Sequence, residues 1–175
     1  MDCFLSNNNI LRHKEHLKTI RSKLSIIVKS CPEINNMNID ALERMRIDRD
    51  VKGEVIYLRK YIMAHELFFD SFSDSVGKCT KLKAAKCSKE RFLYDILEKA
   101  KVSNNCFAFV YINKRQIPCI DISKDLAKPF SAYTPILALD LYEHTYFTDY
   151  GFDLEKYIKN ALIYFNLNRV EANLT

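Results

Sequence analysis

The sequence has few of the residues that interrupt regular structure, and it has no long apolar run. Its 175 residues include 3 glycines and 4 prolines, whereas apolar residues make up 48% and charged residues 28%. These fractions are typical of a globular domain and exclude collagen-like, low-complexity and disordered chains. Apolar stretches such as 24–28 and 135–139 are far shorter than the roughly 18 residues that a membrane span needs. We therefore expect a soluble protein with no membrane partner.

Motifs for zinc, for disulfide scaffolds and for secretion are also missing. The 6 cysteines are scattered, with no C-x-x-C pair and no histidine at zinc-finger spacing. Secreted disulfide domains are usually shorter and richer in cysteine, and no apolar signal segment begins the sequence. We expect reduced thiols and an intracellular location. The basic amphipathic segment 12–29 resembles an organelle-targeting helix, although Asp2 and Glu15 argue against that interpretation.

A mild positive charge is present. The chain has 27 basic and 22 acidic residues, a formal net charge of +5 and a pI near 8.8. This charge permits contact with RNA without predicting it. The segment 78–89 is a lysine-rich connector, and the alternative to an RNA contact is an ordinary solvated surface. The candidate RNA contacts in it are Lys78, Lys81, Lys83 and Lys86.

The hydrophobic pattern changes from helical to strand-like along the chain. It predicts helices over 10–28, 39–46, 51–72, 91–100 and 154–171, and strands over 107–112, 117–122 and 135–140. This order indicates an α+β fold, in which an N-terminal helical part precedes a small three-stranded antiparallel sheet with C-terminal helices. We assign 1–75 to a helical hairpin part and 76–175 to an α/β part, which together form one compact unit.

Three residues could converge on a metal ion. Asp140 ends a predicted buried strand, His144 follows it by four residues, and His65 lies among apolar neighbours on the long predicted helix. A buried carboxylate needs a cation or hydrogen-bond donors. A set of two histidines and one carboxylate suits iron or manganese better than zinc, which favours thiolate ligands. The alternative is that His65 is a satisfied core histidine and Asp140 caps the turn that follows.

A longer pattern surrounds His144. The string Asp140-x-x-Glu143-His144-x-Tyr146 follows Thr134-Pro135-Ile136-Leu137-Ala138-Leu139. It resembles the Asp-x-Trp-Glu-His-Ala-Tyr signature of the iron/manganese superoxide dismutases. The resemblance covers most of the chain and implies the architecture of that family, helices before a three-stranded antiparallel sheet and a helical C-terminus. Further similar segments are Tyr157-Ile158-Lys159-Asn160, Phe165-Asn166-Leu167, His65-Glu66-Leu67-Phe68-Phe69 and Phe107-Ala108-Phe109-Val110.

The first helix departs from the family pattern, which reads His-x-x-x-His-His-x-x-Tyr and begins with a metal ligand. An alignment through Thr19 and Leu24 places Arg12 at the ligand position and His16 at the second histidine. His13 lies one residue away, and it could serve only if the helix were rotated by about 100°. The alternative is that His13 and His16 belong to a solvated basic helix face.

Other polar groups of the family site are replaced. Ile20 and Phe147 stand where the family has the two tyrosines of the substrate channel. Tyr61 lies one turn before His65, at a position where the family can carry the glutamine that orients the metal-bound water, and no glutamine occurs between 123 and 139. Such outer hydrogen bonds tune metal affinity and activity, and their loss usually costs about 10- to 100-fold. We therefore expect little or no rapid turnover.

The resemblance implies roles for the remaining candidates. It makes His65, Asp140 and His144 ligands of iron or manganese, with His13 as a fourth ligand only after the register change, and no metal if the site has degenerated. It places Glu143, Tyr146 and His16 around the metal or in a dimer bridge, because in the family the glutamate reaches the ligand histidine of the other subunit. We assign no catalytic residue.

Two hypotheses follow from the resemblance and the departures. The favoured one is a structural or interaction subunit with a degraded metal site, similar to the dismutase-like paired subunits of some mitochondrial ribosomes, with ribosomal RNA and proteins as partners and a mitochondrial location. The other is an active iron or manganese superoxide dismutase that uses His13. Under both we expect a homodimer, or a heterodimer with another dismutase-fold protein.

Overall fold

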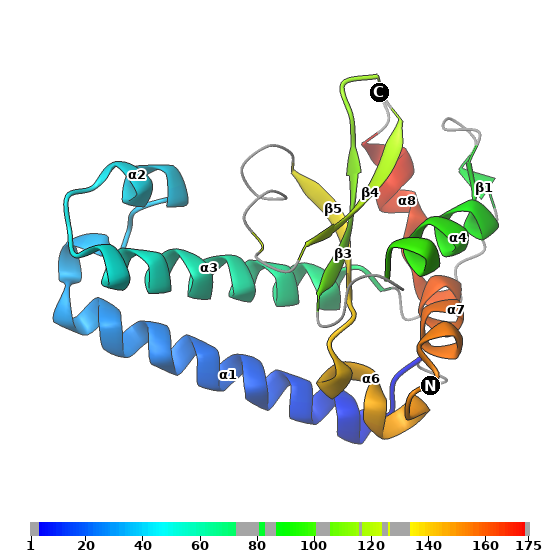
Figure 1. The fold of residues 1–175 in the computed structure, drawn as a ribbon, viewed down its shortest axis with the longest axis horizontal. Helices are drawn as coiled ribbons and strands as arrows, with labels where there is room; N and C mark the ends of the chain where they lie inside the picture. Colours follow the sequence, from blue (N-terminus) through cyan, green and yellow to red (C-terminus); the bar gives the residue numbers. More distant parts are fainter. Residues whose placement is uncertain are drawn as a thin grey trace.

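The computed structural model describes residues 4–72, 81–82, 87–100, 106–115, 117–123, 126 and 134–173. Helices come first, a sheet follows, and helices end the chain (Figure 1). The elements are α1 (Asn7–Ser30), the 3-10 helix η1 (Pro32–Ile34), α2 (Ile39–Arg44), α3 (Arg49–Asp70), β1 (Lys81–Leu82), β2 (Cys87–Ser88), α4 (Lys89–Ala100), β3 (Phe107–Ile112), β4 (Pro118–Ser123), β5 (Pro135–Asp140), α6 (Glu143–Tyr150), α7 (Leu154–Tyr164) and α8 (Leu167–Ala172).

The main sheet has three antiparallel strands in the order β4-β3-β5. The central strand β3 pairs with β4 from Phe107 opposite Ser123 to Ile112 opposite Pro118. On its other side, Phe107 lies opposite Asp140, the last residue of β5. All six residues of β5 are buried, which explains its continuous apolar run. The expected α+β fold with a three-stranded antiparallel sheet is confirmed.

Two long antiparallel helices, α1 and α3, form a hairpin that extends beyond the sheet, with α2 at its far end (Figure 1). The sheet end of α3 packs against β5, and α6 connects β5 to the N-terminal end of α1. The main core contains residues from both parts of the chain, such as Phe68 of α3, Phe109 of β3 and Tyr157 of α7. This packing brings the first helix, the third helix and the end of β5 to one place.

A second, smaller core stabilises the far end of the hairpin. Ile34, Leu42 and Val55 are fully buried there. The Arg59 guanidinium donates hydrogen bonds to the carbonyl oxygens of Ile34, at 2.6 Å, and Asn35, at 3.1 Å. The Ile34 carbonyl also accepts from the backbone N–H of Met37 at 3.3 Å. The arginine adds side-chain donors at this helix end and so stabilises the chain reversal between α1 and α2.

The C-terminal helix predicted over 154–171 is wrong in one respect, because the structure divides it into α7 and α8. Phe165 leaves the helix to form a β-bridge with Phe72, and the backbone N–H of Asn166 donates to the carbonyl of Ser71 at 2.9 Å. These long-range hydrogen bonds replace the helical ones. The lysine-rich connector also contains a pair of short strands, β1 and β2.

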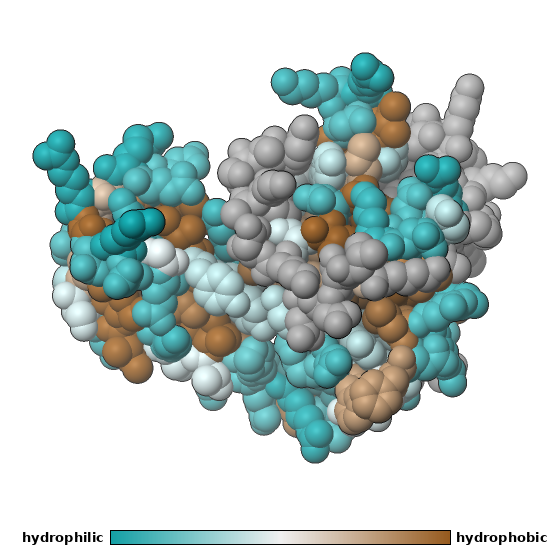
Figure 2. Space-filling view, viewed as in Figure 1, coloured by the Kyte–Doolittle hydropathy of each residue, from teal (hydrophilic) through white to brown (hydrophobic). Residues whose placement is uncertain are grey.

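The surface of the described residues is mixed in character. Figure 2 shows hydrophilic residues interrupted by apolar ones, including an apolar projection where α6 is followed by α7. Phe147 and Phe152 are 47% and 84% exposed there. None of the helices in the described ranges combines the length and the hydrophobicity that a membrane-spanning helix requires.

Candidate metal centre

Asp140 occupies the end of β5 with a completely buried carboxylate. Its Oδ1 accepts a hydrogen bond from the backbone N–H of Tyr142 at 2.9 Å. Its backbone carbonyl accepts one from the Tyr157 hydroxyl at 2.8 Å. The first contact orients the carboxylate and the second holds the backbone at the end of the strand. The other carboxylate oxygen, Oδ2, faces the histidines of the neighbouring helices.

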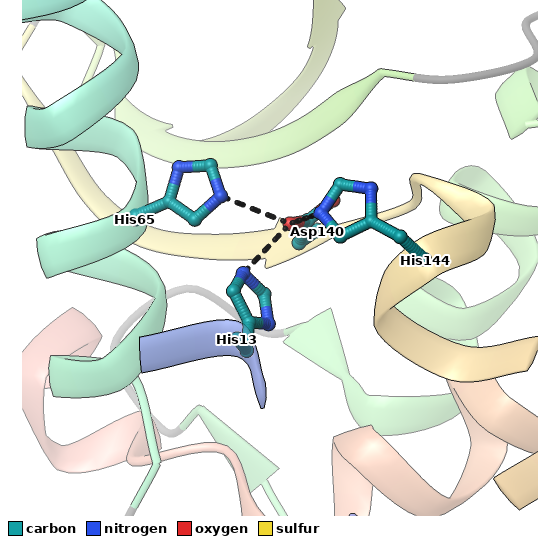
Figure 3. Close-up of side chains that lie close together, drawn as sticks. All are labelled: His13, His65, Asp140 and His144. Atoms are coloured by element: carbon teal, nitrogen blue, oxygen red, sulfur yellow. Dashed lines mark ion pairs between the residues drawn. The ribbon is translucent and has the colours of Figure 1, made fainter. Parts of the chain in front are cut away.

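Three histidines surround that oxygen (Figure 3). The Nε2 atoms of His13, His65 and His144 lie 3.2, 3.5 and 3.8 Å from Asp140 Oδ2. One ligand atom from each of the four residues lies within 4.8 Å of the others. Nitrogen and oxygen ligands bound at about 2.1 Å are about 3.0–3.6 Å apart in a coordination sphere. The structure therefore brings the predicted set together at spacings close to those around an ion.

The orientation of His65 is fixed by its own helix. Its Nδ1 lies 2.8 Å from the backbone carbonyl oxygen of Tyr61, one turn earlier on α3. A carbonyl oxygen only accepts hydrogen bonds, so Nδ1 carries the proton and Nε2 presents its lone pair to Asp140. Both facing atoms, His65 Nε2 and Asp140 Oδ2, are buried without a hydrogen-bond partner in the structure, as are both ring nitrogens of His13.

Burial and neighbouring side chains shift the pKa values of His65, His144 and Asp140. Burial lowers the pKa of His65 to about 4, and it also lowers the pKa of His144. Burial by itself raises the pKa of Asp140, but the nearby histidines outweigh it and the pKa is lowered overall. His65 and His144 are therefore neutral and Asp140 is ionised at neutral pH, which are the forms that bind metals.

The alignment that places Arg12 at the ligand position of the first helix does not match the structure, which brings the alternative candidate His13 to the cluster. Arg12 is exposed, whereas His13 is 2% exposed and belongs to the cluster. The interpretation of His13 as part of a solvated face is also wrong. The buried residues Asn9, His13 and Leu17 recur every four residues on α1, and Arg12 lies about 100° away from them around the helix. The apolar stripe that continues through Leu17 could have identified His13, because it places this residue and not Arg12 on the inner face.

His16 lies next to the cluster without joining it. It is exposed, and its Nε2 is 3.2 Å from the hydroxyl oxygen of the buried Tyr61. The ring of Tyr61 lies 4.2 Å from that of His65, measured between centroids. Burial raises the pKa of the Tyr61 hydroxyl. The pKa of His16 is lowered by burial and by the nearby His13. Tyr61 occupies the position where the family can carry the water-orienting glutamine, and in this chain its hydroxyl pairs with the imidazole of His16.

A pocket of about 650 Å³ opens onto the cluster. His13 and His144 form part of its wall, so one side of the candidate site faces solvent, whereas Phe107 covers His65 on the buried side at 5.1 Å between ring centroids. The remaining lining residues are Arg12, His16, Glu143, Phe147, Thr148 and Phe152. The position assigned to the second channel tyrosine, Phe147, therefore does lie on the approach to the site.

The other predicted residues have varied positions. Glu143 is exposed at the first turn of α6, and Tyr146 is buried and stacks on Tyr157 at 5.0 Å between ring centroids. Lys81 lies in β1, whereas Lys78, Lys83 and Lys86 lie outside the described residues. An RNA contact by these lysines stays a prediction.

Comparison with known proteins gives one family. The model of the C-terminal domain of iron/manganese superoxide dismutases matches residues 80–173, more than half of the chain, and the match includes Asp140 and His144. No curated protein matches the sequence. The helices α1 and α3 precede the matched residues, so the positions of His13 and His65 come from the structure. The chain belongs to the iron/manganese superoxide dismutase family.

Proposed function

We propose that the protein binds one iron or manganese ion through His13, His65, Asp140 and His144 and disproportionates superoxide there. The observation that carries the proposal is the orientation of His65, whose Nε2 lone pair faces the ionised Asp140 Oδ2 at 3.5 Å. Two buried acceptors in this arrangement repel each other, and an unsatisfied buried polar atom costs about 1–3 kcal/mol. A cation between them removes both costs.

The donor set fits the metals that the family uses. Three imidazole nitrogens and one carboxylate oxygen contain no soft thiolate, and this combination suits iron or manganese. The backbone carbonyl of Tyr61 and the backbone N–H of Tyr142 orient His65 and Asp140 from behind. Such outer contacts are what keep ligands preorganised for a metal.

The residues of this chain divide the work of such a site. Bound iron or manganese would supply a one-electron redox couple. Asp140 contributes one negative charge in a buried position, and His65 and His144 contribute neutral nitrogens. The pocket beside His13 and His144 admits a small substrate from the solvent side, and Phe107 packs against His65 on the buried side.

The test is metal content together with superoxide consumption. Protein produced with both iron and manganese available should contain about one of these ions per chain, and it should consume superoxide faster than the same protein loaded with zinc, which has no redox couple. A protein that binds neither ion would overturn the proposal. A protein that binds iron but consumes no superoxide would leave a metal centre without the dismutase activity.

A second candidate function, an interaction subunit of a larger assembly, is favoured by the charge of α1. This helix carries six basic residues and one acidic residue, so its formal net charge of +5 equals that of the whole chain. A folded helix with this charge suits a polyanionic partner such as ribosomal RNA. In this role the protein would be located in the mitochondrion. Affinity for a short RNA that falls steeply with salt would support it. Binding that is absent at low salt would oppose it.

We also propose that the protein forms a dimer through the surface around α6. Phe147 and Phe152 contact each other there at 5.0 Å between ring centroids, and both are exposed beside Glu143 on the pocket rim. Exposed apolar groups beside a functional pocket are typical of an interface. Members of the family commonly dimerise, and the partner is a second copy or another protein of this fold.

A further inference from the structure

A buried amide connects the helix of His13 to the helix of His144. Asn9 of α1 is 1% exposed. Its side-chain nitrogen donates to the backbone carbonyl of Thr145 at 2.7 Å and to Asp149 Oδ2 at 3.0 Å. Both acceptors belong to α6, so a single side chain binds the two helices together.

The same carboxylate also holds the beginning of α1. Asp149 Oδ2 accepts a hydrogen bond from the backbone N–H of Ser6 at 2.8 Å, and Ser6 caps the helix by accepting from the N–H of Asn9 at 3.2 Å. A carboxylate at this place also suits the positive end of the helix dipole. Partial burial raises the pKa of Asp149, but the hydrogen bonds from Ser6 and Asn9 lower it overall, so the carboxylate is ionised at neutral pH.

This network is adjacent to two of the four candidate ligands. Asn9 precedes His13 by four residues, so both side chains lie on the inner face of α1. Thr145 follows His144 directly in the sequence. The rings of His13 and His144 are 5.5 Å apart, and the sequence separates them by most of the chain. The hydrogen bonds of Asn9 set the rotation and position of α1 against α6 within one turn of these ligands.

We propose that Asn9 is a positioning residue, which together with Asp149 holds His13 and His144 at the separation that a metal ion requires. The inference rests on the proposed metal centre and names a determinant of its affinity outside the ligand set. The residue type follows from the contacts, because an amide nitrogen can donate to two oxygens at once. Aspartate has nearly the same shape but cannot donate when ionised, and it would repel Asp149.

The test compares Asn9→Asp with Asn7→Asp. Asn7 is exposed in the same helical turn, so its variant makes the same chemical change without touching the network. Manganese(II) affinity is measured by titrating the free ion with electron paramagnetic resonance, and the ligand geometry by the visible spectrum of the cobalt(II)-loaded protein. We expect Asn9→Asp to weaken manganese binding by at least about tenfold and to change the cobalt spectrum, and Asn7→Asp to match the wild type in both.

Each result has a separate meaning. If Asn9→Asp is folded and binds manganese as the wild type does, with the same cobalt spectrum, the positioning role is wrong and the metal centre stands. If the wild type binds neither manganese nor iron, the proposed function itself is wrong. If Asn9→Asp does not fold, Asp149→Ala removes an exposed partner of the same network. Weaker manganese binding by folded Asp149→Ala then supports the role, and unchanged binding overturns it.

Discussion

His13 Nε2 lies 3.2 Å from Asp140 Oδ2, although one residue is in the first helix and the other ends the last strand. Both side chains are at most 1% exposed. The contact exists because α1 and α3 form a hairpin whose base packs against the sheet and α6. It adds a third histidine to the two that surround the carboxylate, and it makes the candidate site a four-residue set.

Replacement of His13 should therefore remove metal binding. We expect His13→Gln to weaken iron or manganese binding by at least about tenfold, because a direct ligand matters no less than the outer contacts for which such losses are usual. The control is His16→Gln, on the same helix and beside the same pocket but outside the cluster. Metal content after dialysis measures both variants. Equal metal content in the two would contradict the assignment of His13.

The pair of Tyr61 and His16 should affect activity without holding the metal. We expect Tyr61→Phe to keep its metal, because the hydroxyl contacts His16 and not the four ligands. Loss of this hydrogen bond releases the His16 ring at the pocket, and we expect superoxide consumption to fall by about tenfold or more. Tyr57→Phe is a matched control, since Tyr57 lies one turn earlier on α3 and is 46% exposed. Equal activity of the two variants would show that the hydroxyl of Tyr61 has no functional part.

Acid should destabilise the metal-free protein through His65. Its pKa is about 4 in the folded state against an ordinary value of 6.5, so between these values the unfolded chain binds a proton that the folded protein does not. Stability is therefore greatest above pH 6.5 and falls as the pH is lowered toward 4, by about 3 kcal/mol for this group. Urea unfolding at several pH values measures the slope. His65→Gln should have a flatter slope than the wild type, and an unchanged slope would contradict this explanation.

Chelation should lower the melting temperature of the native protein. A ligand that binds only the folded state stabilises it by about 2.7 kcal/mol when its concentration is 100 times its dissociation constant. For a domain of this size, we expect each kcal/mol to correspond to about 2–4 °C. Calorimetry before and after removal of the metal measures the shift, with readdition of iron or manganese as the control. A protein whose melting temperature does not respond to either ion has no metal site of the proposed kind.

The fold could be predicted because its elements have clear local patterns. Residues 135–139 are continuously apolar, and the structure places them in the buried strand β5 that such a run indicates. The helix break at Phe165 could not be predicted in the same way. Its cause is pairing with Phe72 and Ser71, which are far away in sequence, and local periodicity contains no information about such contacts.

Prediction of the site from the sequence is limited in the same way, by contacts between residues that are far apart in the chain. Asp140 and His144 are close in sequence, so their pattern was sufficient to group them. The position of His13 depends on the rotation of α1 about its axis. An alignment through Thr19 and Leu24 places the neighbouring Arg12 at the ligand position instead. The buried contacts of Asn9 with α6 set that rotation, and they join segments at opposite ends of the chain.

The last prediction concerns the surface around α6. If Phe147 and Phe152 belong to a dimer interface, the double variant Phe147→Ser/Phe152→Ser should dissociate the dimer. Burial of each aromatic side chain in the interface would stabilise the dimer by about 1.5–3 kcal/mol, and the variant loses this contribution. Ile26→Ser is the control, since Ile26 is 66% exposed on α1 and does not line the pocket. Sedimentation velocity over a range of concentrations measures association.

Glu143 separates two forms of that interface. In a dimer that uses this carboxylate across the axis, Glu143→Gln should weaken association. The substitution removes the negative charge that the group across the axis would pair with, and a neutral amide makes weaker hydrogen bonds. In a dimer held by the aromatic pair alone, the substitution should have little effect while the double phenylalanine variant still dissociates. A wild-type protein that is monomeric at all concentrations would contradict both forms, and it would leave a heterologous partner of the same fold as the remaining candidate for this surface.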